Sequence, residues 1–115
     1  MSRSWKLFLR DILESAKKVV RYTQGMDLDS FVKNEMAYDA VLRNLEIIGE
    51  AAKHIPDEVR RRYPDIAWRE MAGLRDILTH AYFGLDDEVL WDIVQNEVPS
   101  LVDHIERILQ LEGNL

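Results

Sequence analysis

The sequence predicts an all-α protein, arranged as an antiparallel bundle of four long helices. Apolar residues recur at steps of three and four along most of the chain, which is the period of a helix face that packs on a core. The alternating pattern of a half-buried strand is weak throughout. Short connections separate the helical stretches and favour antiparallel neighbours. The 115 residues suit one domain with one core, over 1–115.

The first half of the chain predicts two long helices. One apolar stripe covers 5–20, and Gly25 can close that helix in a left-handed conformation. The second stripe covers 38–55, and Pro56 ends it. Phe31 could belong to a separate first turn between them. The candidate N-caps of the second helix are Asp27 and Asp29.

The middle of the chain predicts a short helical turn and a third long helix. The turn covers 57–63 and lies between two prolines, which suit the start and the end of a helix. The third long helix is expected over about 66–82, with Gly84 as its natural C-cap.

A kink is expected in the last helix. This helix starts at Asp86 or Asp87, where carboxylates suit a helix N-terminus. Pro99 falls inside its apolar stripe. Because proline removes an internal hydrogen bond and clashes with the preceding turn, we expect the kink near 95–99.

The composition excludes several classes of protein and site. There is no cysteine, which excludes disulfides, thiolate metal sites and a cysteine nucleophile. This suits a reducing compartment, and we expect a cytoplasmic protein. No apolar run approaches the length of a membrane span, and the first residues lack the apolar region of a signal peptide. The formal net charge of −6 has the wrong sign for a protein that coats nucleic acid nonspecifically.

The charge is unevenly distributed along the chain. Residues 1–22 carry six basic and two acidic side chains, whereas residues 85–112 carry eight acids and only Arg107. Two interpretations remain open. The first residues could form a local basic surface, or both regions could be ordinary solvated helix faces.

The stretch RDILTHAYFG, residues 75–84, gathers side chains that can carry chemistry. Arg75 and His80 are five residues apart, so they do not stack as an i, i+4 pair, but the long arginine can still converge with the histidine on one external group. Asp76 precedes His80 by four residues and could hold the imidazole in one tautomer. Tyr82 follows near the expected helix end, where its hydroxyl can reach solvent.

An arginine and a histidine together suit the cleavage of RNA. A histidine can take the proton of the 2′-hydroxyl or protonate the leaving 5′-oxygen. A guanidinium can hold the phosphate with two hydrogen bonds and stabilise the charge that develops on it. One histidine cannot easily be base and acid at once, so a symmetric dimer would supply both roles. No third ligand accompanies Asp76 and His80 at a recognisable spacing, so we expect no metal and no cofactor.

A purely structural interpretation of the same residues also remains open. Arg75 and Asp76 could form a surface ion pair. His80 could be a cation favoured at a helix C-terminus. Tyr82 could be a half-buried aromatic residue with its hydroxyl in water.

Other polar and aromatic residues have weaker signals. His54 and His104 have no motif partner, and we expect structural or surface roles for them. The arginines at 60–62 could contact RNA phosphates or belong to a solvated turn. The tryptophans are expected to be core or dimer contacts; they are Trp5, Trp68 and Trp91.

The motif resembles the RX4HXY motif of HepT-like proteins, which are toxins of the HEPN superfamily. The resemblance extends beyond these ten residues. The block over 41–99, VLRNLEIIGEAAKHIPDEVRRRYPDIAWREMAGLRDILTHAYFGLDDEVLWDIVQNEVP, is similar to the family's characteristic block. The stretch RDILESAKKVVRYTQGMDLDSF, over 10–31, is similar to its N-terminal helix and turn.

This resemblance implies a HEPN-like bundle that forms a homodimer with the motifs facing across a cleft, and a metal-independent ribonuclease activity. Arg75 and His80 would be the catalytic pair. Tyr82 would be the residue that a partner antitoxin, a minimal nucleotidyltransferase, modifies with AMP from ATP. The AMP group would place bulk and negative charge beside Arg75 and His80 and so block the cleft. The RNA target does not carry over from the family.

A second function from a different class remains open. The chain could be a non-catalytic helical adaptor that binds a nucleotidyltransferase partner and a nucleotide. The motif would then bind a nucleotide phosphate or serve only as a modification site.

Overall fold

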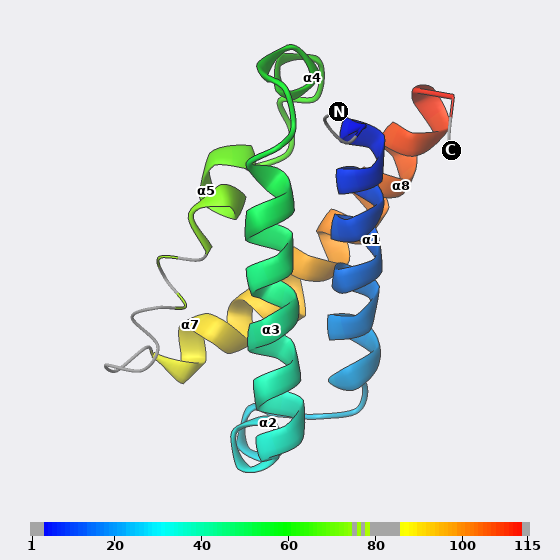
Figure 1. Cartoon of the computed structure of the whole chain (residues 1–115). Coiled ribbons are helices and arrows are strands. Elements are labelled where there is room, and N and C mark those ends of the chain that lie inside the picture. The colour runs from blue at the N-terminus through cyan, green and yellow to red at the C-terminus, as the bar shows by residue number, and fades with distance from the viewer. Residues whose placement is uncertain (1–3, 75, 77, 79–85, 114–115) are drawn as a thin grey trace.

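The computed structural model describes residues 4–74, 76, 78 and 86–113, and every regular element in that part of the chain is helical. The elements are α1 (Trp5–Tyr22), α2 (Leu28–Lys33), α3 (Glu35–Ala52), α4 (Asp57–Arg62), α5 (Trp68–Ala72), α7 (Asp87–Asp92), the π-helix η1 (Ile93–Glu97) and α8 (Val98–Leu111). Helices α1 and α3 run side by side in opposite directions, and the segment from α7 to α8 crosses them (Figure 1). The predicted all-α bundle is confirmed.

Helix α1 begins and ends at local signals in the sequence. The Ser4 hydroxyl caps its start and accepts a hydrogen bond from the backbone N–H of Lys6 at 3.2 Å. The C-cap is Thr23, and Gly25 follows with a φ of 79°. The predicted left-handed glycine is therefore confirmed, two residues beyond the cap itself.

Helix α2 is the separate turn that was expected around Phe31. Asp27 was a candidate cap for the second long helix, but it caps α2 instead, where its carboxylate accepts a hydrogen bond from the backbone N–H of Ser30 at 2.8 Å. The Ser30 hydroxyl accepts one in return from the Asp27 backbone N–H at 3.0 Å. This reciprocal pair satisfies two backbone donors at the start of the helix. The long helix α3 is capped by Asn34, whose side chain accepts from the backbone N–H of Ala37 at 2.9 Å.

The connection after α3 contains the predicted short helix, α4. Helix α3 ends at Ala52, four residues before Pro56. The Arg60 guanidinium reaches back and donates to the backbone carbonyls of Ala52 at 2.8 Å and Ile55 at 3.0 Å. These carbonyls lie at the helix end, where backbone acceptors lose their helical partners. Arg60 therefore has a structural role in closing α3.

The predicted third long helix is interrupted at Gly73. Its first part is the five-residue α5 over Trp68–Ala72, and Gly73 is the C-cap of that helix. The Gly73 N–H donates to the Arg69 carbonyl at 3.0 Å, and the Gly73 carbonyl accepts from the Asp76 N–H at 3.1 Å. Glycine has a low helix propensity and permits such a break. Residues 74, 76 and 78 are again helical. The expected cap at Gly84 lies outside the described residues.

The expected disturbance of the last helix is confirmed. The chain forms the π-helix η1 over Ile93–Glu97, directly before Pro99. The Val98 N–H donates to the Ile93 carbonyl, five residues back, which is the π pattern. The segment changes direction between α7 and α8 (Figure 1). A proline in the first turn of α8 costs little, because its missing N–H falls where a helix would begin.

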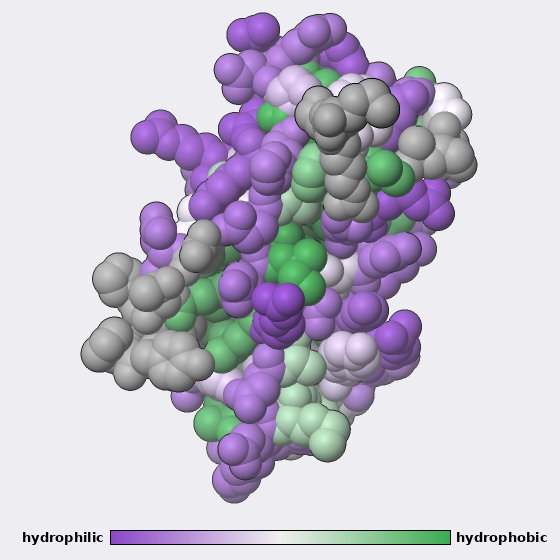
Figure 2. Space-filling model, in the orientation of Figure 1, coloured by the Kyte–Doolittle hydropathy of each residue, from purple (hydrophilic) through white to green (hydrophobic). Residues whose placement is uncertain are grey.

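One apolar core joins α1, α3 and α8 and extends under α5 and α7. Hydrophilic side chains cover most of the face seen in Figure 2, and apolar ones show between them only in small patches. Burying a large aliphatic side chain contributes about 2 kcal/mol, so this core dominates the stability. The side chains with no exposed surface include Leu9, Ile12, Val19, Phe31, Val41, Leu45, Ile48, Leu90 and Ile105.

Polar groups close the end of the bundle where α1, α4 and α8 meet. The Glu112 carboxylate accepts hydrogen bonds from Arg62, at 2.8 Å, and from the Tyr63 hydroxyl. The Lys6 ammonium donates to the Glu112 backbone carbonyl at 2.8 Å. The Tyr63 hydrogen bond, followed by the Arg62 charge, holds the pKa of Glu112 below its ordinary value.

Candidate functional site

Most of the predicted site lies outside the described residues. This applies to Arg75, His80 and Tyr82. Asp76, the predicted orienting residue, is described, and it is helical and exposed. Leu74 and Leu78 on either side of it are partly buried and pack against the core. The start of the motif stretch therefore turns one face to the core and presents Asp76 to solvent.

The chain is held firmly just before the motif. Helix α5 packs against α3, and both Trp68 and Met71 are buried. The Trp68 indole N–H donates to the backbone carbonyl of Tyr63 at 2.9 Å, so this buried ring has its polar atom satisfied. Trp68 is thus a core residue, as predicted.

The chain is also held just after the motif, at the start of α7. The Asp86 carboxylate caps this helix and accepts a hydrogen bond from the Glu88 backbone N–H at 2.9 Å. The Tyr38 hydroxyl, from α3, donates to the Asp87 carboxylate at 2.8 Å. Burial, together with the Asp87 carboxylate, raises the pKa of Tyr38 to about 12. The phenol therefore stays neutral and acts as the donor.

Aromatic side chains complete this second anchor. The Phe31 ring lies 5.0 Å from the Trp91 ring of α7 and 5.3 Å from the Tyr38 ring of α3, measured between centroids. Tilted pairs at these distances are favourable beyond their burial. The segment between α5 and α7, which carries the whole motif, is therefore attached to the core at both ends.

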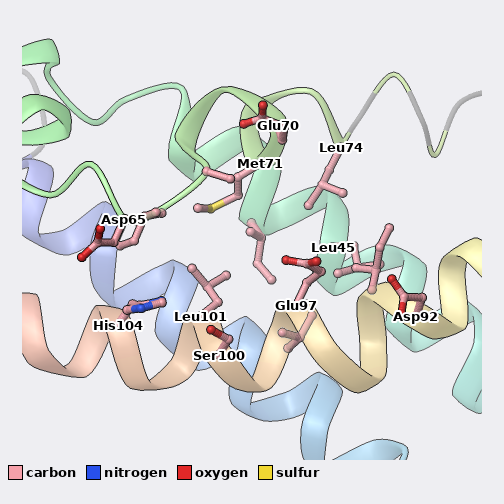
Figure 3. Close-up of a pocket in the computed structure, with 15 residues that line it drawn as sticks. Leu45, Asp65, Glu70, Met71, Leu74, Asp92, Glu97, Ser100, Leu101 and His104 are labelled. Carbon is pink, nitrogen blue, oxygen red and sulfur yellow. The ribbon is translucent and has the colours of Figure 1, made fainter.

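A cavity of about 520 Å³ lies beside the start of the motif, between α5 and the segment η1–α8. Its apolar lining includes Leu45, Met71 and Leu74, which is the residue before Arg75. Figure 3 shows carboxylates spread around it. These acids would repel a phosphate, so the cavity is a poor path for RNA. The polar lining residues are Asp65, Glu70, Asp92, Glu97, Ser100 and His104.

The other two histidines, His54 and His104, line different pockets of the fold. His54 stacks on Phe8 with 4.3 Å between ring centroids and 11° between ring planes. His104 lines the cavity on α8. Within the described ranges, no group of three or more His, Cys, Asp or Glu side chains could hold a metal ion. The described helices also include none long and apolar enough to cross a membrane.

Sequence reasoning missed the Tyr38–Asp87 contact. The apolar pattern assigned Tyr38 only to the inner stripe of its helix. The two residues are 49 positions apart, so no local spacing indicates their hydrogen bond. The one available signal was chemical, because a tyrosine at the edge of a core usually finds a partner for its hydroxyl.

Comparison with known proteins gives consistent matches over most of the chain. Residues 12–108 match the family model described as "Ribonuclease HepT-like". The chain is 47% identical over 104 residues to "Putative RNase MJ1380" of Methanocaldococcus jannaschii, covering 90% of this chain and 95% of the relative. It is 44% identical over 108 residues to "Probable ribonuclease HepT" of Thermococcus cleftensis, covering 94% of this chain and 98% of the relative. No solved structure matches it.

Proposed function

The chain belongs to the HepT-like ribonuclease family, and from this premise we propose that it is the toxin of a toxin–antitoxin pair, acting on cytoplasmic RNA as a homodimeric, metal-independent endoribonuclease. One observation carries the proposal. The family match over 12–108 includes RDILTHAYFG, with an arginine, a histidine and a tyrosine at the spacing of the RX4HXY motif.

The proposed reaction uses the nucleophile that RNA itself contains. The 2′-oxygen attacks the adjacent phosphorus, the bond from phosphorus to the 5′-oxygen breaks, and the products are a 2′,3′-cyclic phosphate and a 5′-hydroxyl. One His80 takes the proton of the 2′-hydroxyl, and a protonated His80 gives one to the 5′-oxygen. Arg75 binds the phosphate and stabilises its developing charge. Asp76, four residues before His80, orients the imidazole.

The homodimer follows from the need for two histidines in opposite protonation states. Each chain has one motif and hence one His80. A two-fold axis between two motifs brings a base and an acid to the same phosphate. The motif segment is anchored at α5 and at α7. This anchoring supports the proposed acid–base role of His80, because such catalysis requires the reacting groups to be held in place.

Tyr82 is the proposed control point. A nucleotidyltransferase antitoxin would transfer AMP from ATP to it: the phenol oxygen attacks the α-phosphorus, the phenol proton is lost, and pyrophosphate leaves. The added phosphate is negative and lies two residues from His80 in sequence. It would compete with the RNA phosphate for Arg75 and fill the cleft.

The test is cleavage of total RNA in EDTA by the wild type, His80→Ala and Arg75→Ala. Mass spectrometry first confirms that Tyr82 carries no AMP. The matched controls are His104→Ala and Arg61→Ala, which remove the same side-chain types outside the motif. We expect cleavage by the wild type and both controls, loss in both motif variants, and cyclic phosphate ends. Products with 3′-hydroxyl ends would exclude this mechanism.

The same experiment tests the adaptor. If the unmodified, dimeric wild type cleaves no RNA while Tyr82 still accepts AMP from the partner enzyme, the chain is a modified adaptor and not a nuclease.

A further inference from the structure

Helix α1 has a strongly basic outer face on an otherwise acidic protein. The formal net charge of the chain is −6. Four cations of α1 are nevertheless exposed, and only one exposed acid, Glu14, lies among them, which leaves four minus one, or three, positive charges. The four cations are Arg10, Lys17, Lys18 and Arg21.

Helix geometry aligns these cations. With 100° per residue, Arg10, Lys17 and Arg21 fall within about 40° of one another on the helix surface. At 1.5 Å per residue they span about 16 Å along the helix axis, and Lys18 lies beside them. We call these four residues the α1 stripe. A row of this kind matches the repeating charge of a nucleic acid backbone.

No ion pair within the described part of the chain neutralises the α1 stripe. The ion pairs found between described residues involve Lys33, Arg43, Lys53 and Arg62 as cations, and none of the four stripe residues takes part in one. Lys6, also on α1, is different because it bonds the Glu112 carbonyl at the end of α8. The stripe therefore keeps its charge available for an external anion.

An aromatic ring lies at the end of the stripe. Tyr22 is 36% exposed, and no other Phe, Tyr or Trp among the described residues is as exposed. The Arg21 guanidinium carbon lies 5.2 Å from the Tyr22 ring centroid. A cation beside an exposed ring is the combination that single-stranded RNA sites use, the cation for phosphate and the ring for a base.

The rest of the surface supports an RNA path along α1. The cavity beside the motif has four carboxylates in its lining and would repel phosphate. Helix α1 lies on the other side of α3 from α5 (Figure 1). The molecule is about 26 Å wide, so an RNA that contacts both α1 and the side where α5 lies must be several nucleotides long.

We propose that the α1 stripe, with Tyr22 at its end, is a binding surface for single-stranded RNA outside the reaction centre. It would raise the affinity for long substrates and leave the chemistry at the motif unchanged. This inference rests on RNA being the substrate, as in the proposed function. The negative charge elsewhere would keep RNA from binding at random.

The test measures binding separately from cleavage. The probe is a labelled 2′-O-methyl RNA about 20 nucleotides long, which exceeds a typical single-strand site and lacks the 2′-hydroxyl nucleophile. Its affinity is measured by fluorescence anisotropy over a range of salt concentrations. The stripe variant is Lys17→Ala/Lys18→Ala/Arg21→Ala. The matched control removes the same charge elsewhere and is Lys33→Ala/Lys53→Ala/Arg61→Ala.

We expect the stripe variant to bind at least about tenfold more weakly at low salt and its salt slope to fall by about 2, since each phosphate contact of a single strand contributes about 0.7. The control should change little. The charge-preserving variant Lys17→Arg/Lys18→Arg should bind like the wild type, which would attribute the loss to the removed positive charge. Tyr22→Leu should weaken binding and Tyr22→Phe should not.

Several results would overturn the proposal: equal losses in both triple variants, no loss in the stripe variant, or wild-type affinity for polyglutamate equal to that for RNA. Cleavage of a dinucleotide, which is too short to occupy the α1 stripe, tests the nuclease activity separately from binding to the stripe. If the stripe variant cleaves it normally but binds long RNA weakly, both hold. If the wild type cleaves nothing and binding still depends on the stripe, only the nuclease assignment fails.

Discussion

The two ends of the bundle are closed by different chemistry. Where α2, α3 and α7 meet, the aromatic rings of Phe31, Tyr38 and Trp91 pack together. At the opposite end, where α4 lies (Figure 1), the Arg62 guanidinium donates to the Glu112 carboxylate. The aromatic end lies directly after the motif segment, and the charged end joins the two termini of the bundle.

Each end contains one tyrosine hydroxyl that donates to a carboxylate, which makes them a matched pair. At the aromatic end Tyr38 donates to Asp87, and burial is the main cause that raises the pKa of Tyr38. At the charged end Tyr63 donates to Glu112, and that hydrogen bond is the main cause that raises the pKa of Tyr63. The same contact thus depends on packing at one end and on charge at the other. We therefore expect the free energy of unfolding to depend on side-chain volume at the aromatic end. At the charged end we expect it to depend on the protonation of the carboxylate.

The largest effect is expected from Phe31→Ala at the aromatic end. The Phe31 side chain has no exposed surface, and it touches rings from two helices. Its removal leaves a cavity, so the free energy of unfolding should fall by about 3–5 kcal/mol. Urea unfolding followed by circular dichroism measures this. The control variant Phe31→Leu should show a smaller fall in the free energy of unfolding. A loss under about 1 kcal/mol for the alanine variant would mean that the rings do not hold this end together.

Tyr38→Phe should have a smaller effect at the same end, because it keeps the ring and removes only the hydroxyl. We expect a loss of about 1 kcal/mol, since Asp87 is partly exposed and water can replace the donor.

The pH dependence of Tyr38→Phe has a definite sign. The pKa of Tyr38 is raised from 10.0 to about 12, so its contribution to stability is complete below pH 10 and is lost as the pH rises toward 12. The difference in free energy of unfolding between the wild type and Tyr38→Phe, measured by urea unfolding, should therefore shrink between pH 10 and pH 12. Tyr22→Phe is the control for an exposed tyrosine. A difference that stays constant up to pH 12 would contradict the neutral donor assigned to Tyr38.

Local features of the fold were predictable from sequence, and long-range ones were not. The Asp27 cap, the turn at α4 and the disturbance before Pro99 each depend on residues a few positions apart. The third helix was predicted as continuous because its apolar pattern continues through Gly73, whereas the helix is interrupted there. Periodicity reports which face is buried and does not report where a backbone turns.

The same distinction applies to the candidate site, where the motif could be predicted from sequence and the contacts that anchor it could not. The motif residues Arg75, His80 and Tyr82 could be named from their spacing and from the family resemblance, and their roles stay predictions. The contacts that hold the motif segment could not be named, because Tyr38 meets Asp87 across 49 positions and Trp68 relies on a backbone carbonyl for its polar atom. The first contact is too distant in sequence for a local signature, and the second, although its residues are five positions apart, matches no spacing pattern.

At the charged end, Glu112→Gln should make stability less dependent on acid. The pKa of Glu112 is lowered from its ordinary value of 4.5, so its contribution is present above that value and is lost as the pH falls through the lower, folded value. The free energy of unfolding of the wild type should therefore lose its advantage over that of the variant as the pH falls below 4.5, whereas at neutral pH the wild type should unfold at a higher urea concentration. Glu58→Gln is the matched control, because Glu58 also bonds Arg62, at 3.1 Å, but is 78% exposed. If the free energy of unfolding depended on pH in the same way in both variants, Glu112 would not be the carboxylate that makes this end sensitive to acid.

The smallest effect is expected from Lys33→Ala, which removes a charge at the aromatic end. Lys33 and Asp29 form an i, i+4 pair at 3.3 Å on α2, and their side chains are 77% and 84% exposed. An exposed pair of this kind contributes under about 0.5 kcal/mol and is screened by salt. Urea unfolding at low and high salt should therefore place this variant within about 0.5 kcal/mol of the wild type at both. A larger loss that disappears in salt would show that charge also matters at this end and would weaken the contrast with Glu112. If the small value holds, Phe31 and Lys33, two positions apart on one short helix, differ in their contribution only because one is buried among rings and the other is in water.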